Sequence, residues 1–280
     1  MDEQTSAPSE TVSVEFSLAY GDGQITATAE VPSGKTNLTQ LLPILQALDD
    51  SLIGAAISEA VAEGRSISCK AGCGACCRQL VPISIFEAEA LTAWMRTLPE
   101  SGQQELAQRF DRALRTLAAS GILERLVASG SDFWDAETEA HKSLAIDYYR
   151  QRVPCPFLVD EACSIHPMRP LICREYLVTS APEHCIDPTT LQTEMVHLPL
   201  RLMPALNQIG AEIEHNTRGW IPLVFLFAWM KANAHPGEKI SGTGPEVLYT
   251  FLSRIPPSDG SVESTDESLT SEGGNMPAAN

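Results

Sequence analysis

The sequence predicts a mainly α-helical α+β protein, in which an N-terminal β-hairpin and several helices pack around a cysteine-rich loop core. Three observations support this class. Apolar residues alternate strictly near the N-terminus, they recur at helical spacing in most later segments, and all eight cysteines fall between residues 69 and 185. At 280 residues, with 44% apolar and 20% charged residues, the chain can bury a sizeable core.

Residues 12 to 32 have the two-residue period of paired β-strands. Val12, Val14, Phe16, Leu18 and Tyr20 alternate with mostly polar residues, and a second alternating run follows the turn residues 21–23. The next apolar residues have helical spacing: Leu41, Ile44, Leu45, Leu48 and Leu52, with Pro43 in the first turn and Gly64 at the end. We therefore expect a disordered start over residues 1–10 and a hairpin-and-helix extension over residues 11–64.

Further helices are predicted on both sides of the second group of cysteines. Ser84 and Glu87 have the spacing of a capping box that opens a helix reaching about residue 97. Ser101 and Gln104 repeat that spacing before another helix, interrupted at Gly121. Later helical patterns cover residues 136–152, 198–213, 219–233 and 246–254. The predicted domains are a cysteine-cluster domain at 65–185, a helical region packed on it at 186–255, and a disordered acidic tail at 256–280.

The charge balance excludes two classes of partner. The formal net charge is −17, from 19 basic and 36 acidic residues, which disfavours binding to nucleic acids and to anionic membranes. The start of the chain lacks the basic and apolar regions of a secretory signal. The most apolar run, residues 220–230, is too short to cross a bilayer and is expected to form a buried helix. We therefore expect a cytoplasmic protein.

The cysteines occur in two groups. Four lie within nine residues and four in a later segment: Cys69, Cys73, Cys76 and Cys77, then Cys155, Cys163, Cys173 and Cys185. A reducing cytoplasm keeps thiols free, so metal ligation explains them better than disulfides. Thiolates suit zinc and iron-sulfur clusters. Eight could form two four-thiolate zinc sites, or one iron-sulfur cluster with four thiols left for other work. All eight are predicted metal ligands.

The adjacent pair Cys76 and Cys77 is difficult to fit to a single ion. Neighbouring side chains diverge along the backbone, which favours two nearby metal positions or a multinuclear centre. In the competing interpretation, Cys77 is a small buried apolar residue.

Other polar residues flank the cysteines. Arg169 and Arg174 are candidates to offset thiolate charge from outside the ligand shell, whereas Lys70 and Arg78 are explained nearly as well as surface charges. His166 and His184 are alternative ligands or hydrogen-bonding groups. Glu87 could bind iron, but the capping box accounts for it without metal.

Three blocks in order resemble the CxxCxxCC (YkgJ-type) cysteine-cluster family. They are Gly72-Cys-Gly-Ala-Cys-Cys77, Cys155-Pro-Phe-Leu158, and Cys163-Ser-Ile-His-Pro-Met-Arg-Pro-Leu-Ile-Cys-Arg-Glu-Tyr176. The resemblance covers roughly residues 65–185 and implies a mostly bacterial zinc- or iron-chelating domain, with oxidoreductase or flagellin lysine-methylase labels on some members. The spacing Cys69-x3-Cys73 is longer than the family's first spacing, and many members have tyrosine at the position of His166, so no role is transferred there.

Two functions remain open from the sequence. The first is a cytoplasmic metal-binding protein that holds zinc or iron, including an iron-sulfur or multinuclear centre. The second is an iron-dependent oxidoreductase or methylase-like enzyme that uses the same cluster. Cys69-x3-Cys73-x2-Cys76 also has the radical S-adenosylmethionine spacing, but it follows a predicted helix rather than an early strand of a β/α barrel. A thioredoxin-like role lacks the βαβ context.

Overall fold

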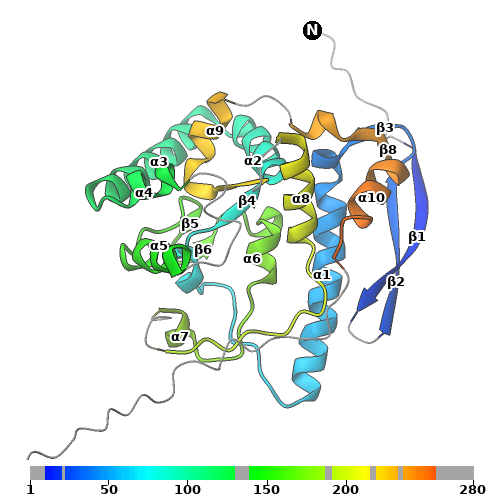
Figure 1. Ribbon diagram of the computed structural model, residues 1–280, viewed down its shortest axis with the longest axis horizontal. Helices are drawn as coiled ribbons and strands as arrows, with labels where there is room; N and C mark the ends of the chain where they lie inside the picture. The colour runs from blue at the N-terminus through cyan, green and yellow to red at the C-terminus, as the bar shows by residue number, and fades with distance from the viewer. Residues whose placement is uncertain are drawn as a thin grey trace, which may run out of the picture.

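Helices dominate the computed structural model, and the predicted α+β class with an N-terminal β-hairpin is confirmed. The structure describes residues 10–20, 23–129, 139–186, 191–214, 219–232 and 236–256. The predicted disordered ends, apart from residues 10 and 256, lie outside this range. In Figure 1 the long helix α1 has the hairpin and α10 on one side and α2 to α6 on the other.

The described elements, in chain order, are as follows. The strands are β1 (Thr11–Tyr20), β2 (Gly23–Pro32), β3 (Lys35–Asn37), β4 (Pro82–Ser84), β5 (Leu158–Val159), β6 (Ala162–Cys163), β7 (Trp220–Pro222) and β8 (Ser241–Thr243). The α-helices are α1 (Leu38–Ala62), α2 (Ile85–Thr97), α3 (Glu100–Ala119), α4 (Ile122–Ala128), α5 (Glu139–Arg150), α6 (Leu171–Glu175), α7 (Pro182–Ile186), α8 (Met203–Glu214), α9 (Leu226–Ala232) and α10 (Gly244–Leu252). Short 3₁₀ helices are η1 (Ala75–Arg78), η3 (His166–Met168), η4 (Leu223–Phe225) and η5 (Pro236–Lys239).

The N-terminal hairpin forms as the alternation predicts. β1 and β2 pair antiparallel from Thr11 opposite Pro32 to Tyr20 opposite Gly23. Helix α1 begins at Leu38, earlier than expected, because Asn37 and Gln40 form a capping box that the sequence analysis missed. Pro43 consequently lies beyond the first turn. The helix ends where expected, with Gly64 at φ 81°.

The two predicted capping boxes have different outcomes. Ser84 caps α2 as predicted, since the Glu87 amide donates to its Oγ at 3.2 Å and Glu87 Oε2 accepts from the Ser84 amide at 2.8 Å. The box at Ser101 is wrong, because α3 already begins at Glu100 after Pro99 and no side chain caps it. The break at Gly121 is confirmed, with φ 73° between α3 and α4.

The C-terminal region differs most from the prediction. Residues 220–222, expected to be helical, form β7 and pair antiparallel with β4, and helix resumes fully only at Leu226. Pro222 lacks an amide hydrogen and favours an extended backbone, which explains the strand. The helix predicted from residue 198 begins at Met203. β8 pairs with β3, so the C-terminal region contacts the chain at two early positions.

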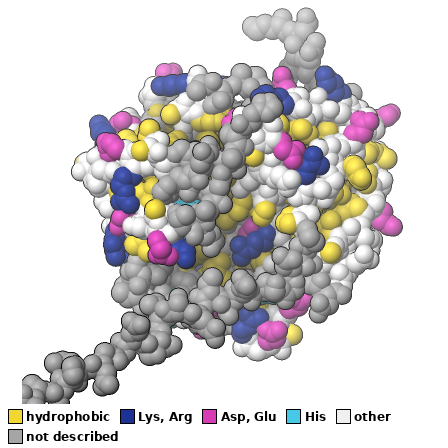
Figure 2. All heavy atoms as spheres, viewed as in Figure 1, with side chains coloured by type: hydrophobic (Ala, Val, Ile, Leu, Met, Phe, Trp, Pro, Cys, Tyr) yellow, Lys and Arg dark blue, Asp and Glu magenta, His cyan; other side chains and the backbone are white. Residues whose placement is uncertain are grey.

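The main core joins the hairpin, α1, α2, α8 and α10, and Figure 2 shows charged side chains spread over the surface around it. By length and composition alone, α1 could span a membrane. A core helix meets the same criterion, and Leu38, Leu41 and Leu45 of α1 are fully buried in the core. A second apolar cluster joins α3, α4 and α5.

Candidate metal centre

The eight thiols come from two segments of the chain, residues 69–77 and residues 155–185, and all are free. Cys69 and Cys73 lie between α1 and η1, whereas Cys76 and Cys77 lie in η1 itself. Cys155 precedes β5, Cys163 ends β6, Cys173 lies in α6 and Cys185 in α7. The 155–176 segment, expected to be a loop, therefore contains a two-residue hairpin and a short helix.

Backbone hydrogen bonds join these segments. The Cys155 amide donates to the Cys77 carbonyl at 2.7 Å, and the Ser68 amide donates to the Val178 carbonyl at 3.0 Å. The Val178 amide in turn donates to Cys69 Sγ at 3.4 Å. The early cysteine segment is thus held to both parts of the later one.

Gly74 and Arg78 tighten the junction between the two segments. A Cβ at Gly74 would lie 2.6 Å from Glu161 Oε2, 2.8 Å from Leu158 Cδ1 and 3.2 Å from the Glu161 carbonyl oxygen, so a larger residue would displace Leu158 and Glu161. The Arg78 guanidinium donates to both carboxylate oxygens of Glu161, at 2.6 and 2.9 Å, and to the Gly74 carbonyl at 2.7 Å. Arg78 therefore links the two segments instead of being a simple surface charge.

One group of thiols comprises Cys69, Cys73 and Cys185. They pack together around Ala75 and Val178. Burial raises the pKa of Cys185 to about 11, with repulsion from Cys69, Cys76 and Cys73 adding to the rise. A hydrogen bond between Tyr176 and Cys185 opposes it.

A second group comprises Cys77, Cys155, Cys163 and Cys173. Burial raises the pKa of Cys155 to about 12 and that of Cys173 well above its usual value, and each thiol feels the charge of Cys163. The charges of Cys155 and Cys173 in turn raise the pKa of Cys77. Cys155 and Cys163 pack against the main core beside Phe157, which is fully buried and meets the rings of Trp94 and Phe110 edge-on.

Cys76 lies between the two groups. Its charge raises the pKa of Cys69 and Cys185 in the first group and of Cys155, Cys163 and Cys173 in the second. A hydrogen bond with the Cys77 thiol lowers the pKa of Cys76 to about 7 and raises that of Cys77. The 3₁₀ turn of η1 thus gives the adjacent cysteines different neighbours, and Cys77 lies beside Cys155 and Cys173 of the second group.

The donor set is suitable for zinc or iron because thiolates are soft, anionic ligands. With the side chains as they stand, no three His, Cys, Asp or Glu side chains of the described ranges converge on one point. The Cys76–Cys77 and Tyr176–Cys185 hydrogen bonds involve three of the thiols. Metal binding would therefore require deprotonation and rotation of these side chains.

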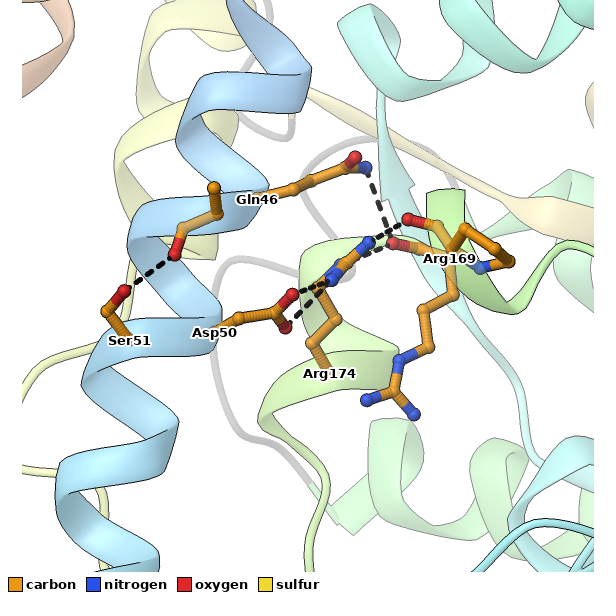
Figure 3. Close-up of polar contacts among 7 residues, drawn as sticks. Gln46, Asp50, Ser51, Arg169 and Arg174 are labelled. Atoms are coloured by element: carbon orange, nitrogen blue, oxygen red, sulfur yellow. Dashed lines mark hydrogen bonds and ion pairs between the residues drawn. The ribbon is translucent and has the colours of Figure 1, made fainter. Parts of the chain in front are cut away.

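The two candidate arginines outside the ligand shell face different ways, as Figure 3 shows. Arg174 is 4% exposed and turns towards α1, where it binds both carboxylate oxygens of Asp50 at 2.7 Å and donates to the carbonyl of Arg169 at 2.9 Å. Arg169 extends away from this network. Its charge opposes the burial that raises the pKa of Cys69 and Cys163, and it helps to lower that of Cys76. Arg169 therefore acts on both thiol groups, whereas Arg174 anchors the loop.

The histidines and Glu87 make other contacts. His166 is largely exposed. Partial burial of its ring lowers its pKa, and the positive charges of Arg169 and Arg174 lower it further. A ring nitrogen of His184 lies 2.5 Å from the Gln192 carbonyl oxygen. Glu87 is buried in its capping box and also accepts from the Leu171 amide at 2.7 Å, which ties α2 to α6.

Sequence analysis missed a buried acidic pair beside this region. Asp49 is 1% exposed, both of its carboxylate oxygens lack a hydrogen-bond partner, and one oxygen of buried Glu175 is likewise unpartnered. Burial, followed by repulsion from Glu175, raises the pKa of Asp49 to about 8. The sequence did contain a signal for the burial of Asp49. It lies four residues after Leu45 and three before Leu52, which places it on the apolar face of α1.

Comparison with known proteins agrees with this site. Residues 68–190 match the model of the CxxCxxCC family, described as a putative zinc- or iron-chelating domain. This part of the chain is similar to the CxxCxxCC domain. The match includes all eight cysteines, and it supports a metal-binding role with zinc or iron as the ion. No curated protein and no solved structure matches the chain significantly.

Proposed function

We propose that the CxxCxxCC domain binds two metal positions through two sets of four thiolates. The first set is Cys69, Cys73, Cys76 and Cys185, and the second is Cys77, Cys155, Cys163 and Cys173. The observation that carries the proposal is the division of the thiols into two neighbouring groups with Cys76 between them. Four thiolates form a closed structural zinc site and equally hold an iron-sulfur cluster.

Arg169 supports this arrangement electrostatically. Eight thiolates carry more negative charge than two divalent ions neutralise, and a guanidinium close to both groups offsets part of the excess. We also place the protein in the cytoplasm, because eight free thiols ready for metal suit a reducing compartment.

Metal content and single substitutions test the proposal. Protein purified without oxygen should contain two equivalents of zinc or iron by elemental analysis, or about four or eight equivalents of iron if both sets hold iron-sulfur clusters, with sulfur as the neighbouring atom in X-ray absorption. Cys185→Ser and Cys76→Ser should each weaken the first site, whereas Cys163→Ser should weaken the second. A folded, metal-free protein would reject metal binding, and equal effects of Cys185→Ser and Cys163→Ser on one shared ion would reject the two-site division.

The same spectra address the enzymatic alternative. An iron-dependent oxidoreductase or methylase-like enzyme needs a coordination position open to substrate or cosubstrate. An oxygen or nitrogen neighbour at iron would favour that function. Four sulfur neighbours at zinc would favour a structural or storage role.

A further inference from the structure

A cavity of about 270 Å³ lies beside the second thiol group, between α3 and the segment that leads into Cys155. Arg109, Arg112 and Thr116 line one wall, and Gln151, Arg152 and Cys155 line another. The three residues of α3 are spaced by three and four positions and so share one face of the helix.

The charge of this cavity is opposite to that of the whole chain. Three of its lining residues are arginines and none is Asp or Glu, although acidic residues outnumber basic ones by 36 to 19. Guanidinium groups carry planar pairs of N–H donors that match carboxylate and phosphate oxygens. The lining therefore selects for anions.

Two of the arginines have contacts that leave them able to bind a ligand. Arg112 makes no side-chain hydrogen bond or ion pair with any residue that the structure describes. Arg109 pairs with Glu105, whose side chain is 66% exposed and which does not line the cavity. An exposed pair of this kind contributes little free energy, so an anion in the cavity can compete for Arg109.

The third arginine is held in place by the protein. Arg152 has a left-handed backbone with φ 54°, an uncommon conformation for a residue other than glycine. Its guanidinium lies 4.7 Å from the centre of the Tyr149 ring and donates to the Tyr149 hydroxyl at 2.7 Å. The Tyr149 hydroxyl also bonds to the Cys185 carbonyl at 2.7 Å. Arg152 is therefore fixed between the cavity and the first thiol group.

We propose that this cavity binds a small organic anion with two or more carboxylate or phosphate groups. Three arginines on two walls favour a ligand with two charged ends, and a cavity of about 270 Å³ accommodates a small molecule. Cys155 belongs to the cavity wall, so the bound anion lies against the segment that positions the second thiol group. The site consists of protein side chains alone and does not depend on metal binding.

Calorimetric titration of the purified full-length protein tests the site. Succinate and glycerol 3-phosphate serve as probes, with 1,4-butanediol and glycerol as uncharged controls. We expect saturable binding of at least one of the two anions, and we expect added sodium chloride to weaken it. The uncharged controls should not bind. Preference for succinate identifies a carboxylate ligand, and preference for glycerol 3-phosphate a phosphate ligand. Absence of saturable binding by both anions overturns the proposal.

Substitutions on α3 provide a matched comparison. Arg112→Gln removes an arginine that has no side-chain partner among the described residues, so folding should be unaffected, and it should weaken anion binding about tenfold. Arg115→Gln on the same helix removes an arginine that pairs with Asp111 and lies outside the cavity lining. It should change the affinity less than about twofold. Equal losses in the two variants would show nonspecific attraction and overturn the site.

Discussion

Asp49 provides a direct test of the buried acidic pair. Asp49→Asn replaces the carboxyl group with a neutral amide of almost the same shape, so packing against α6 is retained. In the native protein, the carboxyl group is 1% exposed and has no hydrogen-bond partner in the structure, and Glu175 is the first charge to act on it. We expect the substitution to stabilise the fold at neutral and alkaline pH.

The size of the effect follows from the pKa. The folded-state value of about 8 lies above the ordinary value of 3.8, so the folded protein holds this proton more tightly than the unfolded chain does. The resulting stability is complete below pH ~4 and is lost as pH rises to ~8. Between pH 5 and pH 8 the loss from this one group is about 3.5 kcal/mol.

Urea unfolding of the native protein and of Asp49→Asn from pH 5 to pH 8, at the same metal content, measures the contribution of Asp49 to stability. Other titrating groups, including the thiols, contribute to both proteins and largely cancel in the difference. The free energy of unfolding of Asp49→Asn relative to the native protein should therefore rise by about 3.5 kcal/mol across this range. Asp111→Asn, at an exposed position, should give a nearly constant difference. A pH-independent difference for Asp49→Asn would refute the assignment of a protonated interior carboxyl group.

Three further substitutions test the contacts that hold the cysteine segments. Arg174→Leu should lower the free energy of unfolding by about 3 kcal/mol in urea titrations, because the carbonyl groups of Arg169 and Pro167 lose their hydrogen-bond donor. Arg174→Lys should restore only part of this loss. Phe157→Ala should lower the free energy of unfolding by about 3–5 kcal/mol in the same urea titrations, because the ring fills the core beside Cys155. The variant should also lose metal to a chelator more readily than the native protein. Gly74→Ala should reduce metal affinity in competition titrations by forcing Leu158 and Glu161 away, whereas Gly54→Ala, in an open position of α1, should leave it unchanged.

The elements with a clear local period were predictable. The hairpin follows from alternation, and α2 follows from a capping box whose two residues lie three positions apart. Trp220–Pro222 was not predictable in this way, because a short, continuously apolar run fits a buried strand as well as a helix. Only its distant partner β4 decides between the two.

The sequence predicted which residues make up the site, but not how the eight thiols divide into two groups. The sequence identifies eight thiols and the conflict at Cys76 and Cys77, and the resemblance to a known family identifies the domain. Which thiols are neighbours depends on the turn of η1 and on the path of the chain between Cys155 and Cys185. The different directions of Arg169 and Arg174 depend likewise on α1, which is distant in sequence.

The pairing of β4 with β7 has a consequence for biosynthesis. Pro82–Ser84 leaves the ribosome more than a hundred residues before its partner strand Trp220–Pro222. During that interval the four later cysteines emerge and join the four that precede β4, while one edge of the surrounding fold is still unpaired. A chain stopped after Cys185 would therefore present a full complement of thiols without the scaffold that closes around them. Metal delivered after release of the complete chain would meet the ordered site.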